Sequence, residues 1–379
     1  RALDSKTWKY HILDSKVGWD SHNRITMVVD DDGCIHLSGN MHCVPLIYFR
    51  MSKPGDIASF KRIRSMTGKN EKRCTYPKFM RGGAGELIFH YRDGGSGNGN
   101  EIYNVYDHKT KTWRKLLDKP LTDGRGKMNA YMHGPKLGPD GYFHMTWMWR
   151  DTPDCRTNHD ISYARTKDLL HWENAAGKAI KLPITLGVTK GVVIDPVPSG
   201  GGIINVTGYA GFDSKKRVVV SYHKYDAKGN LQAYVARFQD GKWKISCVTD
   251  WNYRWEFKGN GSINVEVRVS AITAAADGKL HLPYRHVKYG SGLLAIDEET
   301  LKPLGMAKAK KSTLPPGIRK RESKFKGIGV RIAGDSGKSA KAGVRYMLRW
   351  ETLGNNRDRK PNGPLPKPSM LRLIKIVER

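Results

Sequence analysis

Three pairs of histidine, tyrosine and arginine side chains are spaced symmetrically about short turns rich in glycine and aspartate. The two members of each pair lie eight to ten residues on either side of the turn: His22 and His42 about Asp32, Tyr76 and Arg92 about Ala84, and Tyr131 and Arg150 about Asp140-Gly141. In a β-hairpin, residues equidistant from the turn lie side by side at the open end. We therefore expect three adjacent pairs at equivalent hairpin ends.

Imidazoles, phenols and guanidinium groups without a pair of carboxylates suit one type of polysaccharide cleavage better than another. Glycoside hydrolysis uses two carboxyl groups that flank the scissile bond. β-Elimination on a uronic acid instead needs the sugar carboxylate neutralised, which a bidentate arginine does well. A histidine or tyrosine then removes the C5 proton, and another protonates the departing glycosidic oxygen. The residue types therefore favour elimination.

The elements that would position these residues are short strands. Alternating apolar and polar runs follow turn signals throughout the chain, and helical periodicity is scarce, which indicates an all-β protein. The turn glycines Gly33, Gly85 and Gly141 are 52 and 56 residues apart. A four-stranded propeller blade has this size, and about seven such repeats fit the 379 residues. Immunoglobulin-like sandwiches would repeat at about 100 residues.

The sequence thus predicts an all-β, seven-bladed β-propeller that forms a single domain over residues 1–379. We expect the runs Trp8–Leu13 and Leu371–Val377 to close the ring. Turns before Trp113, Trp172 and Trp243 resemble degenerate Asp-box turns. If equivalent ends of the inner strands meet at one mouth of the channel, the three pairs form one site. Asn129 is a further candidate for substrate binding there.

Charge points to a polyanionic partner. The chain has 66 Lys and Arg against 36 Asp and Glu, a net charge of +30, which suits nucleic acid, an anionic membrane surface or an acidic polysaccharide. No apolar run is long enough to span a membrane. Residues 302–326 hold nine basic residues and one acid, Glu322. We interpret this segment as a solvated inter-blade insertion, with a phosphate- or sulfate-facing arm as the alternative.

Metal and disulfide signals are weak. Five scattered cysteines form no C-x-x-C pair, so neither a zinc ribbon nor a disulfide framework is indicated. Cys155 and His159 have a spacing that a metal site can use, but a second ligand pair is not identified. The glycine-rich run Asp93–Gly99 lacks the Gly-Lys-Ser/Thr ending of a phosphate loop, and we interpret it as a tight turn.

Several short motifs are informative as a set: Gly18-Trp-Asp-Ser-His22-Asn23, Asn40-Met-His42, Thr75-Tyr76-Pro77, Tyr91-Arg92-Asp93-Gly94, Asn129-Ala-Tyr131, Thr146-Trp-Met-Trp-Arg150 and Asn158-His159-Asp160. Together they resemble a known family, the BNR-repeat-containing propellers that include ulvan lyases and rhamnose–glucuronate lyases, and the resemblance covers most of residues 8–290. The resemblance implies a seven-bladed propeller that cleaves at C4–O of a uronate.

The resemblance also implies roles for individual residues. His22 and His42 correspond to the active-site histidines of the family, Tyr76 to the catalytic tyrosine and Arg92 to the arginine that neutralises the carboxylate. Arg150 corresponds to a substrate-binding arginine, and Tyr131 and Asn129 are placed beside it. Some members carry a structural calcium or zinc ion. The metal ligands in this chain are unknown.

We therefore expect a secreted or periplasmic polysaccharide lyase, active as a monomer on an acidic, uronic-acid-containing polysaccharide that is sulfated or contains rhamnose and glucuronate. The chemistry requires no cofactor, and neither a nucleic-acid partner nor a membrane span is expected. A non-catalytic glycan-binding propeller and a sialidase-like glycoside hydrolase are the alternatives. A nucleic-acid-binding protein ranks last, because no recognisable module accompanies the charge.

Overall fold

The computed structural model describes residues 5, 7–308, 314–315, 317–334 and 342–377 of the chain. In this part the chain forms 26 strands and two single-turn 3-10 helices, η1 (Ile57–Ser59) and η2 (Cys155–Thr157), so the all-β prediction is confirmed. None of the helices in the described residues is long and apolar enough to cross a bilayer. The chain divides into two compact units, residues 1–260 with 265–308 and residues 261–264 with 309–379.

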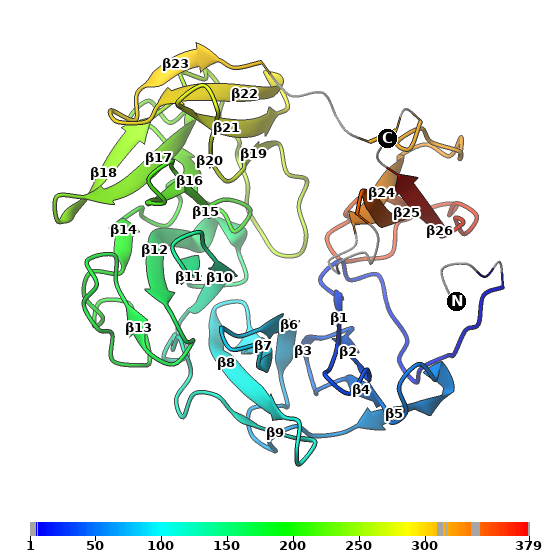
Figure 1. Cartoon of the computed structure of the whole chain (residues 1–379). Coiled ribbons are helices and arrows are strands. Elements are labelled where there is room, and N and C mark those ends of the chain that lie inside the picture. The colour runs from blue at the N-terminus through cyan, green and yellow to red at the C-terminus, as the bar shows by residue number, and fades with distance from the viewer. Residues whose placement is uncertain (1–4, 6, 309–313, 316, 335–341, 378–379) are drawn as a thin grey trace. The chain divides into compact units, whose positions relative to one another are not determined.

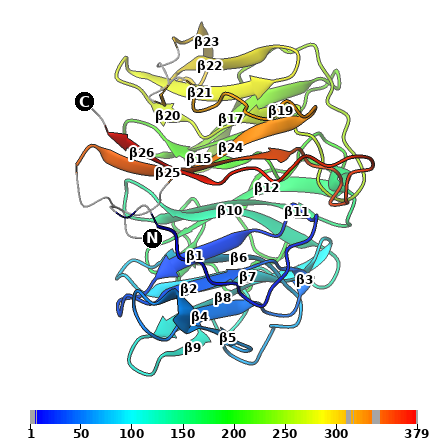
Figure 2. The same ribbon diagram turned by 90° about the vertical axis from the view of Figure 1, so that its right-hand side faces the viewer.

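The first unit consists of successive antiparallel meanders, coloured blue to yellow in Figure 1. Its described residues form five meanders of four strands: β1 (Ile25–Val29), β2 (Ile35–Gly39), β4 (Tyr48–Met51) and β5 (Phe60–Ile63); β6 (Cys74–Arg81), β7 (Leu87–Gly95), β8 (Asn98–Asp107) and β9 (Thr112–Lys115); β10 (Asn129–Leu137), β11 (Phe143–Arg150), β12 (Asn158–Thr166) and β13 (Trp172–Glu173); β15 (Tyr209–Phe212), β16 (Val218–Tyr225), β17 (Leu231–Gln239) and β18 (Lys242–Cys247); β20 (Thr273–Ala274), β21 (Lys279–His286), β22 (Gly290–Asp297) and β23 (Pro303–Met306). Neighbouring strands such as β10, β11 and β12 lie side by side in Figure 2.

Short additional strands extend three of these meanders. β3 (His42–Val44) pairs with β6, β14 (Val193–Asp195) pairs with β12, and β19 (Val267–Val269) pairs with β21. β3 lies in the connection between β2 and β4, so its pairing with β6 joins the first meander to the second. It therefore carries the residues before and within β3 to the edge of β6.

The repeated turns predicted from the sequence occupy equivalent places in the fold. Gly33, Gly85 and Gly141 each lie between the first and second strands of a meander, with φ of 80°, 90° and 83°. A side chain is unfavourable in this left-handed region, which explains glycine at each turn. The three turns therefore start equivalent hairpins, as the equal spacing of the candidate residues requires.

The core of the first unit lies between successive meanders. One cluster combines Tyr103 of β8, Trp147 and Trp149 of β11 and Trp172 of β13. Trp113 of β9 is buried in a second cluster. Both faces of β11 are covered, since every residue of that strand is buried. The tryptophans that follow the Asp-box-like turns thus anchor the outermost strands to the core.

The second unit contains a three-stranded antiparallel sheet of β24 (Ile328–Gly334), β25 (Val344–Leu353) and β26 (Arg372–Val377). Its buried arginine, Arg349, lies 2.9 Å from Glu322 and 3.0 Å from Glu351. Because a buried charge needs compensation, these carboxylates hold Arg349 within the unit.

The blade count of seven is not confirmed. The described residues show five meanders of four strands and one sheet of three strands. Trp8–Leu13 forms no strand, and β26 pairs with β25. The segment 302–326 begins one residue before β23, includes that strand and ends before β24, and residues 309–313 and 316 of it lie outside the described residues. The single domain and the ring closure therefore stay predictions.

A buried histidine makes the first unit sensitive to acid. His36 is fully buried, with Nε2 3.0 Å from Asp30 and Nδ1 2.7 Å from the Tyr48 hydroxyl. Burial outweighs the Asp30 carboxylate and lowers the pKa of His36 from 6.5 to about 4. In the unfolded chain His36 has its ordinary pKa of 6.5, so acid favours the unfolded chain, which binds the proton more readily. The free energy of unfolding therefore falls as the pH drops from 6.5 toward 4, by about 2 kcal/mol at pH ~5.

We expect the denaturant midpoint of the wild type to fall markedly between pH ~7 and ~5. His36→Gln should lower the midpoint at neutral pH but make it less sensitive to acid, because the titrating group is gone. Equal pH dependence of the two proteins would contradict this prediction.

Candidate active site

The first predicted pair meets at the open end of the β1–β2 hairpin. The register pairs Ile25 with Gly39, and its continuation brings His22 opposite His42. The two imidazoles are stacked with ring centroids 4.4 Å apart. The Tyr76 ring lies 5.7 Å from His22 and 6.2 Å from His42. β3 explains this proximity, because its first residue, His42, pairs with Thr75 of β6.

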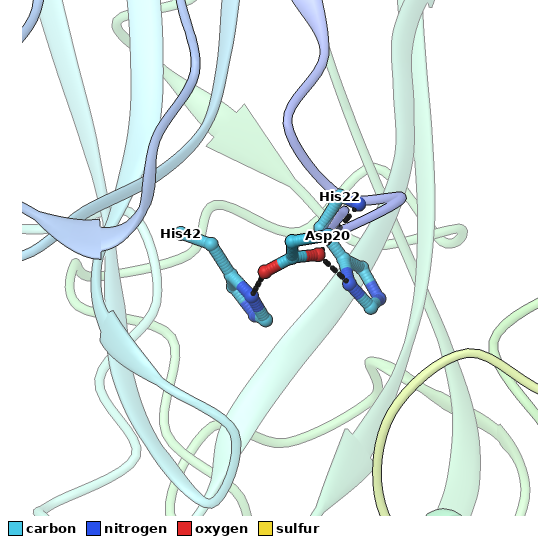
Figure 3. Close-up of side chains that lie close together, drawn as sticks. All are labelled: Asp20, His22 and His42. Atoms are coloured by element: carbon cyan, nitrogen blue, oxygen red, sulfur yellow. Dashed lines mark hydrogen bonds and ion pairs between the residues drawn. The ribbon is translucent and has the colours of Figure 1, made fainter. Parts of the chain in front are cut away.

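A carboxylate that the sequence reasoning did not assign lies between the histidines. Figure 3 shows Asp20 bridging the two rings, with Oδ1 2.8 Å from His22 Nδ1 and Oδ2 2.5 Å from His42 Nδ1. The backbone N–H of His22 also donates to Oδ1. A neutral imidazole that donates from Nδ1 carries its lone pair on Nε2. Asp20 therefore selects, for both histidines, the tautomer with a basic Nε2.

The electrostatics of Asp20 agree with this bridging position. Partial burial by itself raises the pKa of its carboxyl. The hydrogen bonds from the His22 backbone and from both imidazoles outweigh burial and lower the pKa below its ordinary value. Asp20 is therefore ionised at neutral pH and remains an acceptor for both rings.

A bulge aims Tyr76 toward the histidines. The β6–β7 register shifts between Thr75 and Lys78, so that the Cα partner of Arg92 is Thr75 instead of Tyr76. Tyr76 itself has a φ of 54°, in the left-handed region that is unfavourable for a residue with a side chain. Bulges of this kind re-aim side chains, often beside functional sites. The equal-spacing argument predicted the neighbours correctly but missed the bulge.

Arg92 is a buried cation that forms no ion pair with any carboxylate of the described residues. Its side chain is 1% exposed, and its guanidinium carbon lies 4.9 Å from the Tyr76 ring centroid and 5.2 Å from that of Tyr131. Nε donates to the Gly94 carbonyl at 3.1 Å, whereas neither Nη1 nor Nη2 makes a hydrogen bond within the described residues. Leaving a buried charge unpaired is costly. The two nitrogens are therefore suited to a bidentate anion.

The third predicted pair is connected by a hydrogen bond. The register pairs Arg150 with Asn129 and Tyr131 with Met148. Arg150 nevertheless reaches Tyr131, because its Nη1 donates to the phenol oxygen at 3.2 Å. Its other donors bind the backbone carbonyls of residues 152 and 153. The described contacts of Arg150 therefore hold Tyr131 in place.

The glycine-rich turn between β7 and β8 also contacts Tyr131. Gly95 pairs with Asn98, which leaves Ser96 and Gly97 as a two-residue hairpin loop. Ser96 Oγ lies 2.7 Å from the Tyr131 hydroxyl, and the N–H of Gly97 donates to Asn129 Oδ1. Asn129 is fully buried. The tight turn predicted from the sequence is confirmed, and Asn129 fixes its position.

Comparison with known proteins assigns the chain to a family. A family model described as BNR repeat-containing family member matches residues 1–251. The chain belongs to the BNR repeat-containing family. It is 40% identical over 87 residues, 23% of its length, to the long isoform of ulvan lyase from Glaciecola sp. (strain KUL10), and 36% identical over 134 residues, 32% of its length, to the short isoform of ulvan lyase from Alteromonas sp. (strain LOR). These matches span 8% and 25% of the two relatives.

A solved structure supports the fold of this BNR-repeat chain. The polysaccharide lyase Uly1 superposes with a TM-score of 0.59 at 16% sequence identity, over 94% of this chain and 78% of that one. At this identity the likeness concerns the fold. The resemblance inferred from the short motifs is confirmed at the level of the family.

The two phenols of this BNR-repeat site differ in acidity. Burial raises the pKa of Tyr131, but the guanidinium charges of Arg92 and Arg150 outweigh burial and lower it below its ordinary value. For Tyr76, burial and the neighbouring Tyr131 together prevail over the arginines and raise the pKa. Tyr76 therefore keeps its proton at neutral pH.

Two site residues in this BNR-repeat chain were not predicted to take part, Asp20 and Arg24. The guanidinium carbon of Arg24 lies 5.7 Å from the Tyr76 ring centroid. Asp20 precedes the strand and is not symmetric about the turn at Asp32, so hairpin spacing cannot find it. Its position two residues before His22, in the motif Gly18-Trp-Asp-Ser-His22, was the available signal.

One cluster of side chains in the described structure has donors that a metal ion could use. Among the described residues of this BNR-repeat protein, the one group of three potential ligands is Asp20, His22 and His42. Two imidazoles and one carboxylate suit zinc better than calcium, which prefers six to eight oxygens. His159 instead bonds Asp160 at 2.8 Å and Asp151 at 2.9 Å through its two ring nitrogens. The Cys155–His159 pair thus gains no support as a metal site.

Proposed function

We propose that this protein is a polysaccharide lyase that cleaves a uronic-acid-containing polysaccharide by β-elimination. The observation that carries the proposal is Arg92, a buried guanidinium whose two terminal nitrogens lack hydrogen-bond partners in the described structure. A sugar carboxylate would satisfy both nitrogens at once. The ulvan lyases among its relatives support the same reaction class.

In the proposed mechanism, Arg92 binds the C6 carboxylate and neutralises its charge, which makes the C5 proton acidic enough to remove. His42 Nε2 takes that proton, the released electron pair forms the C4–C5 double bond, and the C4–O bond breaks. Tyr76 gives its hydroxyl proton to the departing glycosidic oxygen. Transfer of the proton from His42 back to the Tyr76 phenolate, through solvent, restores the starting state.

The assignment of base and acid follows from the environments of the two groups. The hydrogen bond of His42 Nδ1 to Asp20 leaves the lone pair on Nε2, as a base requires. The raised pKa of Tyr76 keeps its proton available, as an acid requires. His22, stacked on His42 and bonded to the same carboxylate, would position that ring.

The experiment that tests the proposal is a product assay. The protein is incubated with ulvan, rhamnose–glucuronate glycans and glycosaminoglycans, and the ultraviolet absorbance of a 4,5-unsaturated uronate is followed. We expect absorbance with at least one polymer. If no polymer of the panel gives this product, the lyase proposal fails; binding without product would instead favour the glycan-binding propeller.

A glycoside hydrolase is less well supported by the same residues. Hydrolysis of the sialidase type or the two-carboxylate type needs acidic groups close to the scissile bond. In the described structure, Asp20 is the carboxylate that contacts the histidine pair, and both of its oxygens are engaged by imidazoles. A second carboxylate is therefore missing from this described cluster.

We further propose that the meanders are the blades of a seven-bladed propeller and that the enzyme acts as a secreted or periplasmic protein. Four-stranded antiparallel meanders that follow one another are the blade pattern. A polymeric substrate is met outside the cytoplasm, which supports the location. The motifs and the net charge of +30 support an acidic polysaccharide as the partner instead of nucleic acid.

Asp20 provides a test of the proton-transfer assignment. An asparagine there accepts from one imidazole but presents an N–H₂ group to the other, which forces one ring into the opposite tautomer. We expect Asp20→Asn to lower kcat about 10- to 100-fold with little change in KM.

The nearby Asp14→Asn is the matched control, because the side chain of Asp14 is 99% exposed. It should leave both kinetic constants unchanged. A change in KM with an unchanged kcat, or an equal fall of kcat in both variants, would show that Asp20 does not position the histidines for chemistry.

A further inference from the structure

A concave feature of the first unit, separate from the candidate active site, is strongly basic. Its volume is about 810 Å³, and two segments, residues 119–125 and 174–191, line it. It shares no residue with the candidate active site. The second segment directly follows β13, which lies at the periphery of its meander in Figure 1. The volume is within the usual range of ligand sites.

The walls of this cavity are built on hydrogen-bonded backbone. Thr122 and Ile184 form a parallel bridge, and the Ile184 N–H donates to the Leu121 carbonyl at 2.8 Å. The Asp123 N–H in turn donates to the Ile184 carbonyl at 3.0 Å. These bonds join the two lining segments directly. The cavity is therefore preformed, which lowers the entropic cost of binding a ligand.

The charges that line the cavity are of one sign with a single exception. The cationic lining residues are Lys119, Arg125, Lys178, Lys181 and Lys190, and the acidic one is Asp123. Asp123 accepts from the Arg125 backbone N–H at 2.7 Å. Five positive side chains are thus concentrated around one carboxylate.

Some other lysines of the unit are paired with carboxylates. Lys215 lies 2.6 Å from Glu299, and Lys224 lies 2.6 Å from Asp195. Within the described residues, none of the five cavity cations forms an ion pair with a carboxylate. Because like charges raise each other's energy, such a group is stabilised by an anionic ligand.

The remaining lining is apolar or hydroxylic. Ile180, Leu182, Pro183 and Val188 supply apolar surface. Thr185 and Thr189 hold their turn together, with the Thr185 N–H donating to Thr189 Oγ1 at 3.0 Å. A pyranose has apolar C–H faces and can carry sulfate or carboxylate groups. An acidic sugar chain therefore matches both parts of this lining.

We infer that this cavity is a second, non-catalytic binding site for an acidic polysaccharide, which holds the polymer while the active site cleaves it. The choice of a polysaccharide over another polyanion rests on the proposed function. The presence of an anion site rests on the cavity and its five cations alone.

The test compares two charge-matched triple variants in an Arg92→Lys background, in which cleavage is expected to be about a thousandfold slower. The site variant is Lys178→Gln/Lys181→Gln/Lys190→Gln. The control variant is Lys53→Gln/Lys61→Gln/Lys109→Gln, whose lysines are exposed and line no part of the cavity. Heparin, a sulfated uronate polymer, is the probe, and Kd is measured by titration at about 0.15 M salt and again at higher salt.

We expect the site variant to bind heparin about tenfold or more weakly, with a smaller salt dependence, and the control variant to change less than about twofold. Equal losses in both variants would mean diffuse charge and would overturn the inference, as would no loss in either. Duplex DNA is the competing probe. If it binds the protein as tightly as heparin does, and if the site variant weakens DNA binding as much as heparin binding, the site would be assigned to nucleic acid and a glycan ligand would be rejected.

Failure of this inference is distinguishable from failure of the proposed function. Loss of heparin binding in the site variant, together with no unsaturated product from the wild type on any polymer, would retain the binding site and reject the lyase. Product formation by the wild type, together with unchanged heparin binding in the site variant, would retain the lyase and reject the second binding site.

Discussion

Replacing Arg92 with lysine is expected to lower kcat/KM on a uronate polymer by about a thousandfold. The reason is geometric, because a lysine ammonium cannot offer two parallel N–H donors to one carboxylate. Loss of an electrostatic contact aimed at developing charge typically costs about 10²- to 10³-fold. The side chain of Arg92 is 1% exposed, so water does not replace the lost contact. Initial rates of unsaturated-product formation measure the effect.

The matched control for this variant is Arg165→Lys. The guanidinium carbon of Arg165 lies 4.4 Å from the Tyr142 ring centroid. Arg165 therefore stacks on a tyrosine ring, as Arg92 does, but on a different tyrosine that is not part of the candidate site. We expect this control to keep wild-type activity. If Arg92→Lys retained activity within about tenfold of the wild type, neutralisation of the carboxylate by Arg92 would be wrong.

Tyr76→Phe is expected to lower kcat by about 10²- to 10⁴-fold, because it removes the proton that the leaving oxygen requires. The ring that stacks on Arg92 at 4.9 Å is retained, so the site should keep its shape. Polymer binding should change little. Measuring kcat and the Kd for the polymer separately therefore distinguishes a chemical role of Tyr76 from a structural one.

Tyr142→Phe is the control for this second variant, since Tyr142 is the phenol beside Arg165. Both variants should unfold at similar temperatures. Full activity of Tyr76→Phe would remove Tyr76 from the chemistry, and a loss confined to binding would favour a glycan-binding protein. A large loss in kcat with intact binding is the result that the proposed mechanism requires.

Much of the fold was predictable because strand and turn signals are local. Gly33, Gly85 and Gly141 occupy positions with φ near 80–90°, which glycine adopts without penalty. The turn residues therefore identify the hairpins directly. The number of blades was not predictable in this way, since it depends on how sheets pack and close, and the described residues do not confirm seven.

The candidate site was predictable as far as hairpin symmetry extends. In an antiparallel hairpin, residues at equal distances from the turn lie opposite each other. This is why His22 contacts His42 and why Arg92 contacts Tyr76. An extra residue in one strand breaks that symmetry. The bulge between Thr75 and Lys78 shifted the pairing and gave Tyr76 its left-handed backbone, and neither was visible in the spacing.

The sequence by itself therefore determined the strand-rich fold, the hairpin ends and the residue types gathered there, because these depend on short-range periodicity and turn chemistry. The tertiary structure decided the rest: Asp20 between the two imidazoles, the two rings on either side of Arg92, and the basic cavity between residues 119–125 and 174–191. These contacts join segments whose meeting depends on sheet packing and loop closure, which pairwise spacing about a turn does not encode.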